Sequence, residues 1–285
     1  MLVVAGLACQ EVGASLAVLL FPQVGALGMV MLRLVFSALI LLAVSRPRVR
    51  GHDRAAWGAV MRLGLALAVM NGLFYLALER LPLGVTVTIE VLGPLTLSIL
   101  ASRRASAWLW AALALAGVVA LGGGGWDRLD LVGVLFALGA AAMWALYILS
   151  SARVGAAFPK LDGLALAMTV GALVSLPFGI ATAGPGLAPF GLHTLGLLGL
   201  GAAVAVLSST LPYAFELVAL RRLQASAFAI LMSLAPATAA LAGLVLLGQR
   251  LSALEVVGVA LVVAASIGAV RAAGRRARDV TAPLG

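Results

Sequence analysis

Long blocks of apolar residues recur along the chain, separated by short joints that carry charge or are rich in glycine and proline. Each block approaches the roughly 20 residues with which an α-helix crosses about 30 Å of hydrocarbon at about 1.5 Å per residue. The pattern therefore predicts membrane-spanning helices that begin and end at the joints. The ten predicted spans cover residues 2–21, 25–45, 57–78, 83–101, 106–124, 131–151, 163–183, 196–220, 225–247 and 253–272.

Composition supports the same fold class. Of the 285 residues, 64% are hydrophobic and 10% are charged, whereas roughly a quarter of the residues in an ordinary soluble domain are charged. No water-soluble fold could bury so much apolar surface, so we expect an all-α polytopic membrane protein embedded in a lipid bilayer. The formal net charge of +9 could suit nucleic acid, but the cations lie at the ends of spans, and we expect no nucleic-acid partner.

The chain offers little for a metal ion or another cofactor, and we expect none. Its one cysteine and two histidines, His52 and His193, are too few for a thiolate or imidazole metal centre. The glycine-rich stretch 121–130 lacks the Lys-Ser/Thr pair of a phosphate-binding loop, so we interpret it as a loop at the outer surface. Neither HExxH nor GxSxG occurs, so we expect that the protein is not an enzyme.

The Lys and Arg residues predict the orientation of the chain. Of 19 such residues, only Arg80, Arg128 and Arg250 lie in one set of alternating joints, Arg33 lies inside a span, and the rest lie in or near the other set. Loops on the cytoplasmic side are the ones rich in Lys and Arg. Both termini are therefore predicted to be cytoplasmic. An odd number of spans would spoil this alternation, which favours ten.

The sequence also contains an internal repeat. The stretch 76–100 aligns with a stretch near 217–243, where "ALERL" meets "ALRRL" and Pro94 meets Pro236 at a constant offset. Five spans separate the two copies, so the second half must be inverted relative to the first, which is a transporter architecture. We therefore predict ten transmembrane helices in two inverted five-helix repeats. The predicted boundaries are 1–126 for the first repeat, 127–275 for the second and 276–285 for a cytoplasmic tail.

Glu90 is a carboxylate in the middle of the apolar stretch "GVTVTIEVLGPLTLSIL". Its insertion costs about 2.5–3.5 kcal/mol at the bilayer centre, and the surrounding aliphatic residues return roughly 5 kcal/mol. The span therefore still inserts, with Glu90 facing protein or water. Thr86, Glu90, Gly93 and Pro94 share one helical face, which we expect to line a cavity. Pro94 and its repeat partner Pro236 are predicted to bend their helices.

The rise per residue predicts that three buried charges lie at nearly one depth. Below the outer surface, Glu90 is roughly 10 Å deep, Arg33 roughly 12 Å and Glu11 roughly 15 Å. We predict that they form a polar cluster that binds substrate, with Asn71 and Tyr75 as neighbours on the third span. Two interpretations of Arg33 stay open, a role in substrate binding and a structural ion pair with Glu11 or Glu90.

Two residues of the second half are further candidates. Glu216 is either a proton-coupling or substrate-binding group or an anchor near the membrane surface, because it lies shortly before Arg221. Tyr213 either lines the substrate path or packs between helices. For Glu90, we hypothesise that the carboxylate binds either a proton or an ammonium group, and that one replaces the other. Such an exchange would make Glu90 a proton-coupling residue.

Several motifs resemble a known family. "QEVGASLAVLLFPQVGA", "MNGLFYLALERLPLGVTVTIEVLGPL", "ASRR", "WALYILS" and "LSSTLPYAFELVAL" are similar to the inner-membrane threonine/homoserine exporters of the EamA group, in the drug/metabolite transporter superfamily. The resemblance implies two inverted five-helix repeats, a bacterial inner membrane, and export of small amino acids in exchange for protons. It also implies that Glu90 and Glu216 occupy matching acidic positions.

The chain departs from the family pattern at two positions. Glu11 stands at a position where the family carries Gln. Ala235 stands where the exporters carry Glu before the proline. The function we expect is a secondary exporter of threonine, homoserine or related amino acids. The alternatives are an exporter of another metabolite or a drug, and a membrane subunit that scaffolds partners without transport.

Overall fold

The computed structural model describes residues 2–102, 105–121, 130–188, 191–212, 215 and 231–281. Within these ranges every regular element is a helix, and no strand occurs. Seven of the helices in this part of the chain are long and apolar enough to cross a membrane. These findings confirm the predicted class, an all-α polytopic membrane protein.

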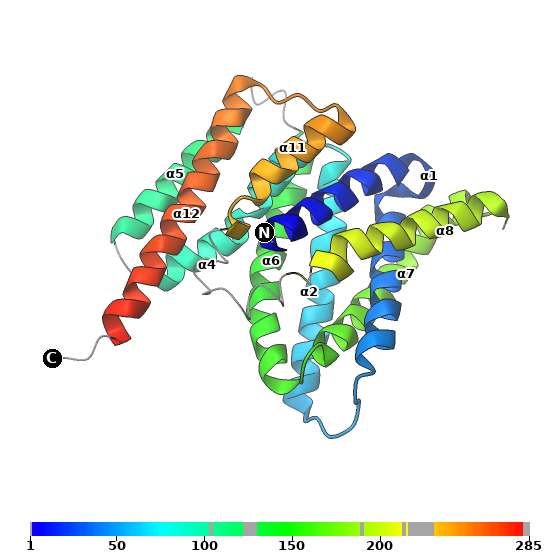
Figure 1. Cartoon of the computed structure of the whole chain (residues 1–285). Coiled ribbons are helices and arrows are strands. Elements are labelled where there is room, and N and C mark those ends of the chain that lie inside the picture. Colours follow the sequence, from blue (N-terminus) through cyan, green and yellow to red (C-terminus); the bar gives the residue numbers. More distant parts are fainter. Residues whose placement is uncertain are drawn as a thin grey trace.

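The first helix, α1 (Leu2–Ser45), contains both of the first two predicted spans. At Gly25 the backbone leaves the helical region, with φ 70° and ψ 163°, a conformation that glycine adopts readily because it has no β-carbon. Pro22 lies just before this point and lacks the N–H group of a regular helix. The two parts of α1, residues 2–24 and 26–45, run in different directions (Figure 1). A kink therefore stands where the sequence predicted a joint.

The kink is held by the end of the next helix. A break in a helix leaves backbone N–H groups without a helical acceptor, and the Ala26 N–H donates to Oε1 of Glu79 at 3.3 Å. Glu79 is the C-cap of α2 (Arg54–Leu78). At its other end α2 is capped by Asp53, whose side chain accepts from the backbone N–H of Ala56 at 2.8 Å.

The fourth predicted span consists of two helices in succession, α3 (Leu83–Glu90) and α4 (Leu92–Ser102), which meet at Val91. Pro94 has no N–H group to donate to the Glu90 carbonyl one turn earlier. Regular bonding resumes from Leu95 N–H to the Val91 carbonyl at 3.2 Å. The interruption thus falls directly beside Glu90.

The remaining described helices follow the order of the predicted spans. They are α5 (Ala105–Leu121), α6 (Leu131–Ala157), α7 (Asp162–Leu187), α8 (Leu192–Ala205) with a π-helix η2 (Val206–Thr210), α11 (Ala235–Leu247) and α12 (Ala253–Thr281). Helix α12 continues nine residues past the predicted span end at 272. Arginine is a good helix former, so leaving the apolar region does not end the helix. Pro236 lies in the first turn of α11 and thus starts a helix.

The helices pack in pairs that join distant parts of the chain. Helix α1 packs against α7 and α8, α2 against α6 and α7, α3 against α11, and α5 against α12. Figure 1 shows α5 and α12 side by side at one edge of the bundle. Small residues permit the close approach of membrane helices: Gly28 lies against Ala183, and Gly64 lies against Val170. The polar cluster described next lies among α1, α2, α3 and η2.

Candidate functional site

Glu11 lies on the first part of α1 and is buried, with 1% of its surface exposed. Among the residues that the structure describes, neither carboxyl oxygen of Glu11 has a hydrogen-bond partner. Its backbone carbonyl accepts from the Ser15 hydroxyl at 2.9 Å. Buried polar groups are nearly always hydrogen-bonded, and exceptions often mark functional positions. The Glu11 carboxyl group is such an exception.

Arg33 lies on the second part of α1 and is 9% exposed. Its Nε donates to Oγ of Ser209 at 3.1 Å and its Nη2 to the carbonyl of Ser208 at 2.9 Å. Its Nη1 donates to the Tyr75 hydroxyl at 3.4 Å, and the guanidinium lies 5.7 Å from the centre of the Tyr75 ring. Both serines belong to η2, and π-helical turns occur frequently at functional sites. Arg33 therefore connects α1 and α2 to the second half of the chain.

Glu90 is the last residue of α3 and is half-buried. The carboxyl groups of Glu11 and Glu90 and the guanidinium of Arg33 lie within electrostatic range of one another. The structure thus brings together the three charges that the depth argument grouped. Their role in substrate binding and coupling stays a prediction.

No ion pair within 4 Å joins these charges in the described part of the chain, where Arg80 and Asp130 form the only such pair. The structural interpretation of Arg33, a direct ion pair with an acid, therefore does not hold in this conformation. The reason is geometric, because η2 and Tyr75 supply acceptors for all three guanidinium nitrogens. The guanidinium is thereby held away from the two acids.

The other candidates of the first half differ in their contacts. Tyr75 is completely buried, bonds to Arg33, and has its ring 5.6 Å from that of Phe21. Asn71 is 5% exposed, and its amide donates to the carbonyl of Leu67 in its own helix at 2.8 Å. Of the two, only Tyr75 has a contact that ties it to the charged cluster, and a binding role for Asn71 stays a prediction.

The face of Thr86, Glu90 and Gly93 was expected to line a cavity, and Gly93 does not fit that expectation. A β-carbon at Gly93 would collide with the backbone carbonyl of Ala141 on α6. Thr86 is fully buried, and its hydroxyl bonds to the carbonyl of Pro82 at 3.0 Å. Gly93 is therefore a packing position, because α4 and α6 approach closely where the side chain is missing.

Sequence reasoning missed Ser208 and Ser209, the η2 partners of Arg33. Their run "LSST" lies inside an apolar block, and small hydroxyl residues in a span were a signal that could have been followed. Tyr213 and Glu216, the candidates of the second half, lie outside the described residues. So does the stretch 122–129 that was interpreted as an outer loop.

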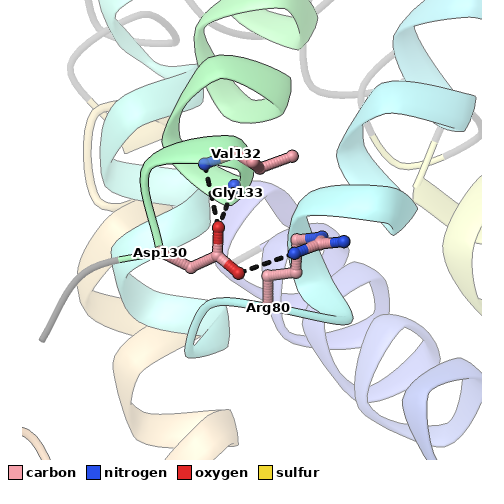
Figure 2. Close-up of polar contacts among 4 residues, drawn as sticks. All are labelled: Arg80, Asp130, Val132 and Gly133. Carbon is pink, nitrogen blue, oxygen red and sulfur yellow. Dashed lines mark hydrogen bonds and ion pairs between the residues drawn. The ribbon is translucent and has the colours of Figure 1, made fainter.

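A second polar cluster lies where α2 turns into α3. Nη1 of Arg80 binds Oδ2 of Asp130 at 2.7 Å, and Oδ1 of Asp130 accepts from the N–H groups of Val132 and Gly133 at the start of α6 (Figure 2). The hydrogen bond from Arg80, followed by that from the Gly133 backbone, holds the pKa of Asp130 below its ordinary value. Close by in sequence, the Leu83 N–H donates to Oε1 of Gln249 at 2.9 Å. These contacts join the two halves of the chain.

No group of three or more His, Cys, Asp or Glu residues that could hold a metal ion occurs in the described ranges. The chemistry of the central cluster is therefore that of two carboxyl groups, one guanidinium and several hydroxyls. Such a set can bind protons, ammonium groups and carboxylates. It is suited to recognition of a small polar molecule inside a membrane, where ionisable residues mark substrate and proton pathways.

Comparison with known proteins gives this site its context. Residues 131–271 match the EamA-like transporter family. The threonine/homoserine exporter RhtA of Escherichia coli strain K12 is 40% identical to this chain over 258 residues, which cover 90% of this chain and 85% of the relative. RhtA of Salmonella typhimurium strain LT2 matches with the same identity and coverage.

One solved crystal structure has the same fold, with a TM-score of 0.59 and 19% identity over 96% of this chain and 99% of its own. At that identity the likeness concerns the fold alone. The resemblance seen in the short motifs is confirmed by the identity to RhtA over most of both chains. The protein is therefore a membrane transporter and belongs to the EamA-like transporter family.

Proposed function

We propose that this protein is a secondary transporter that exports small amino acids similar to threonine and homoserine, by antiport with protons. The observation that carries the proposal is the set formed by buried Glu11 and Arg33 and half-buried Glu90 in a chain that is 40% identical to relatives named threonine/homoserine exporters. A zwitterionic amino acid needs one anionic and one cationic partner, and this set offers both.

Arg33 has donors left for a substrate carboxylate. Arginine carries five N–H donors in a planar fork, and Arg33 gives one from each nitrogen to Ser209, Ser208 and Tyr75. One N–H therefore remains on each terminal nitrogen, which is the arrangement that binds a carboxylate through two parallel hydrogen bonds. The substrate's ammonium group then pairs with Glu11 or Glu90, and Asn71, Tyr75 and Tyr213 form the surrounding wall.

The transport cycle we propose needs ten spans in two inverted repeats, 1–126 and 127–275, followed by a tail, 276–285. Packing supports this arrangement, because α5 packs on α12, and these are helices that the repeat offset equates. The family match over residues 131–271 falls within the proposed second repeat. Inverted repeats carry their substrate site near the bilayer midplane.

The distribution of Lys and Arg supports an orientation with both termini in the cytoplasm. We place the protein in the inner membrane of a bacterium, where export means movement from cytoplasm to the outside. Energy would come from the proton gradient, with Glu90 and Glu216 as the coupling groups. Each would bind a proton from the outer side and release it inside.

The test is transport by purified protein in liposomes. Labelled threonine, homoserine and other small amino acids should accumulate in exchange for unlabelled substrate, and an imposed pH gradient should drive uphill movement. Glu90→Gln removes the ionisable group at constant shape and should abolish the uphill movement. Failure of every amino acid would refute the substrate class and leave another metabolite, a drug or a scaffolding role. Full retention of gradient-driven flux by Glu90→Gln would refute the role of Glu90.

A further inference from the structure

The carboxyl group of Glu11 has surroundings unlike those of Glu90. Glu11 is 1% exposed, and both its carboxyl oxygens are buried without a hydrogen-bond partner in the described part of the chain, whereas Glu90 is half-buried. A buried ionised carboxylate is costly unless it is paired and hydrogen-bonded. The first part of α1 therefore places a carboxyl group where no hydrogen bond or ion pair from the described residues stabilises its charged form.

The charged and titratable groups around Glu11 do not supply the missing partner. Glu90 approaches from α3 and carries the same charge as Glu11 when both are ionised. Arg33 approaches from the second part of α1, but the hydrogen bonds it makes in this conformation go to η2 and to Tyr75 of α2, and not to Glu11. Among the described residues, two carboxyl groups thus share the field of one guanidinium, and neither is paired with it within 4 Å.

The packing of α1 on η2 makes the same region sensitive to charge. Gly13 lies so close to Ser208 that a β-carbon would collide with the serine hydroxyl. The first part of α1, which carries Glu11, is therefore tightly packed on the turn that holds Arg33. A charge on Glu11 therefore needs water or a cation as its partner.

We propose that Glu11 carries a proton in this conformation and exchanges it for the ammonium group of the amino acid, so that proton and substrate compete for one carboxyl group. The inference rests on the proposed function and makes Glu11 the site of exchange. When the substrate enters, the O–H bond of Glu11 breaks and its proton passes to water. The carboxylate then accepts a hydrogen bond that an N–H of the ammonium group donates. When the substrate leaves, a proton from water returns to the same oxygen.

The experiment measures proton release on binding, using purified protein in weakly buffered detergent solution with a pH indicator. Adding threonine to the unaltered protein should release up to about one proton per bound amino acid at a pH where Glu11 is protonated in the substrate-free protein, and about half a proton at the midpoint of its titration. Glu11→Gln should bind threonine more weakly and release none, with an affinity that no longer depends on pH. Glu11→Asp keeps an acid and should still release a proton. Glu255→Gln makes the same change in the first turn of α12 and should behave as the unaltered protein.

The outcomes separate the two proposals. If the unaltered protein neither binds nor transports any amino acid, the proposed function fails and the exchange at Glu11 fails with it. If proton release persists in Glu11→Gln and disappears in Glu90→Gln, the exchange at Glu11 is refuted while export stands. If Glu11→Gln does not fold, the Glu90→Gln variant decides: it must still release a proton on binding, and loss of that release refutes the exchange at Glu11.

Discussion

Replacing Arg33 with lysine tests whether the guanidinium binds the substrate carboxylate. Lysine keeps the positive charge, but its compact ammonium group on a flexible stem cannot present two parallel donors. Arg33 has one N–H left on each terminal nitrogen after its bonds to Ser209, Ser208 and Tyr75. The change should therefore remove one of two charge-assisted hydrogen bonds to the substrate.

The expected size follows from the strength of one such bond. A hydrogen bond to a charged group contributes about 1.5–3 kcal/mol, which corresponds to about a 10- to 150-fold change in affinity. Arg33→Lys should lose that factor for threonine. Threonine amide has no carboxylate charge to lose, so its affinity should change much less. The ratio of the two affinities is the quantity that the structure predicts.

The assay is equilibrium binding of both ligands to both proteins, at a pH where both amino groups are charged, analysed as a double-mutant cycle. Ser209→Ala is the matched control, because it removes one Arg33 partner and leaves the guanidinium in place. Hydrogen bonds between membrane helices contribute about 0.6 kcal/mol on average and at most about 1.7, so this control should lower thermal stability slightly and keep the preference for threonine. Equal losses for threonine and its amide in Arg33→Lys would show that Arg33 only holds η2 in place.

Two further predictions concern the frame around the site. Gly93→Ala should lower the free energy of unfolding by about 1–3 kcal/mol through overpacking, since the added β-carbon meets the Ala141 carbonyl. Gly58→Ala is the control and should not destabilise the protein, because nothing lies within 4 Å of the added β-carbon. Equal melting temperatures for the two variants would contradict the close approach of α4 and α6. Asp130→Asn should melt below the unaltered protein at neutral pH. Arg80 lowers the pKa of Asp130 from its ordinary 3.8. The stability that the ionised Asp130 contributes is therefore complete above the ordinary pKa and is lost as the pH falls through the lowered pKa. A melting difference that stays constant into strong acid would refute the ion pair.

The sequence predicted the helices well because the bilayer leaves few alternatives. Backbone groups in hydrocarbon must bond within a helix, so an apolar block of sufficient length becomes one. The predicted starts at residues 83, 131 and 253 coincide with the first residues of α3, α6 and α12. The predicted depths of Glu11, Arg33 and Glu90 use the same regularity, since a constant rise turns sequence position into depth, and they stay predictions.

Features that depend on contacts across the chain were not predicted. The bonds of Arg33 to Ser208 and Ser209 join residues that are far apart in sequence, and both serines lie in a π-helical turn. The assignment of Gly93 to a cavity was wrong because a shared helical face says nothing about which neighbour lies against it. The joint near Gly25 was expected to be a loop, because hydropathy marks where the apolar pattern weakens without distinguishing a loop from a kink.

The kink at Gly25 connects these observations. Glu11 and Arg33 lie on the two parts of α1 that Gly25 separates, and they meet in one cluster because the chain changes direction between them. The Ala26 N–H that the kink exposes is held by Glu79, and Arg80 beside it binds Asp130 at the start of α6. Any movement that separates the two parts of α1 must therefore act on the outer contacts between the halves as well. A charge on Glu11 would act on these contacts through α1 itself, which gives the proposed proton antiport a physical link between the two places.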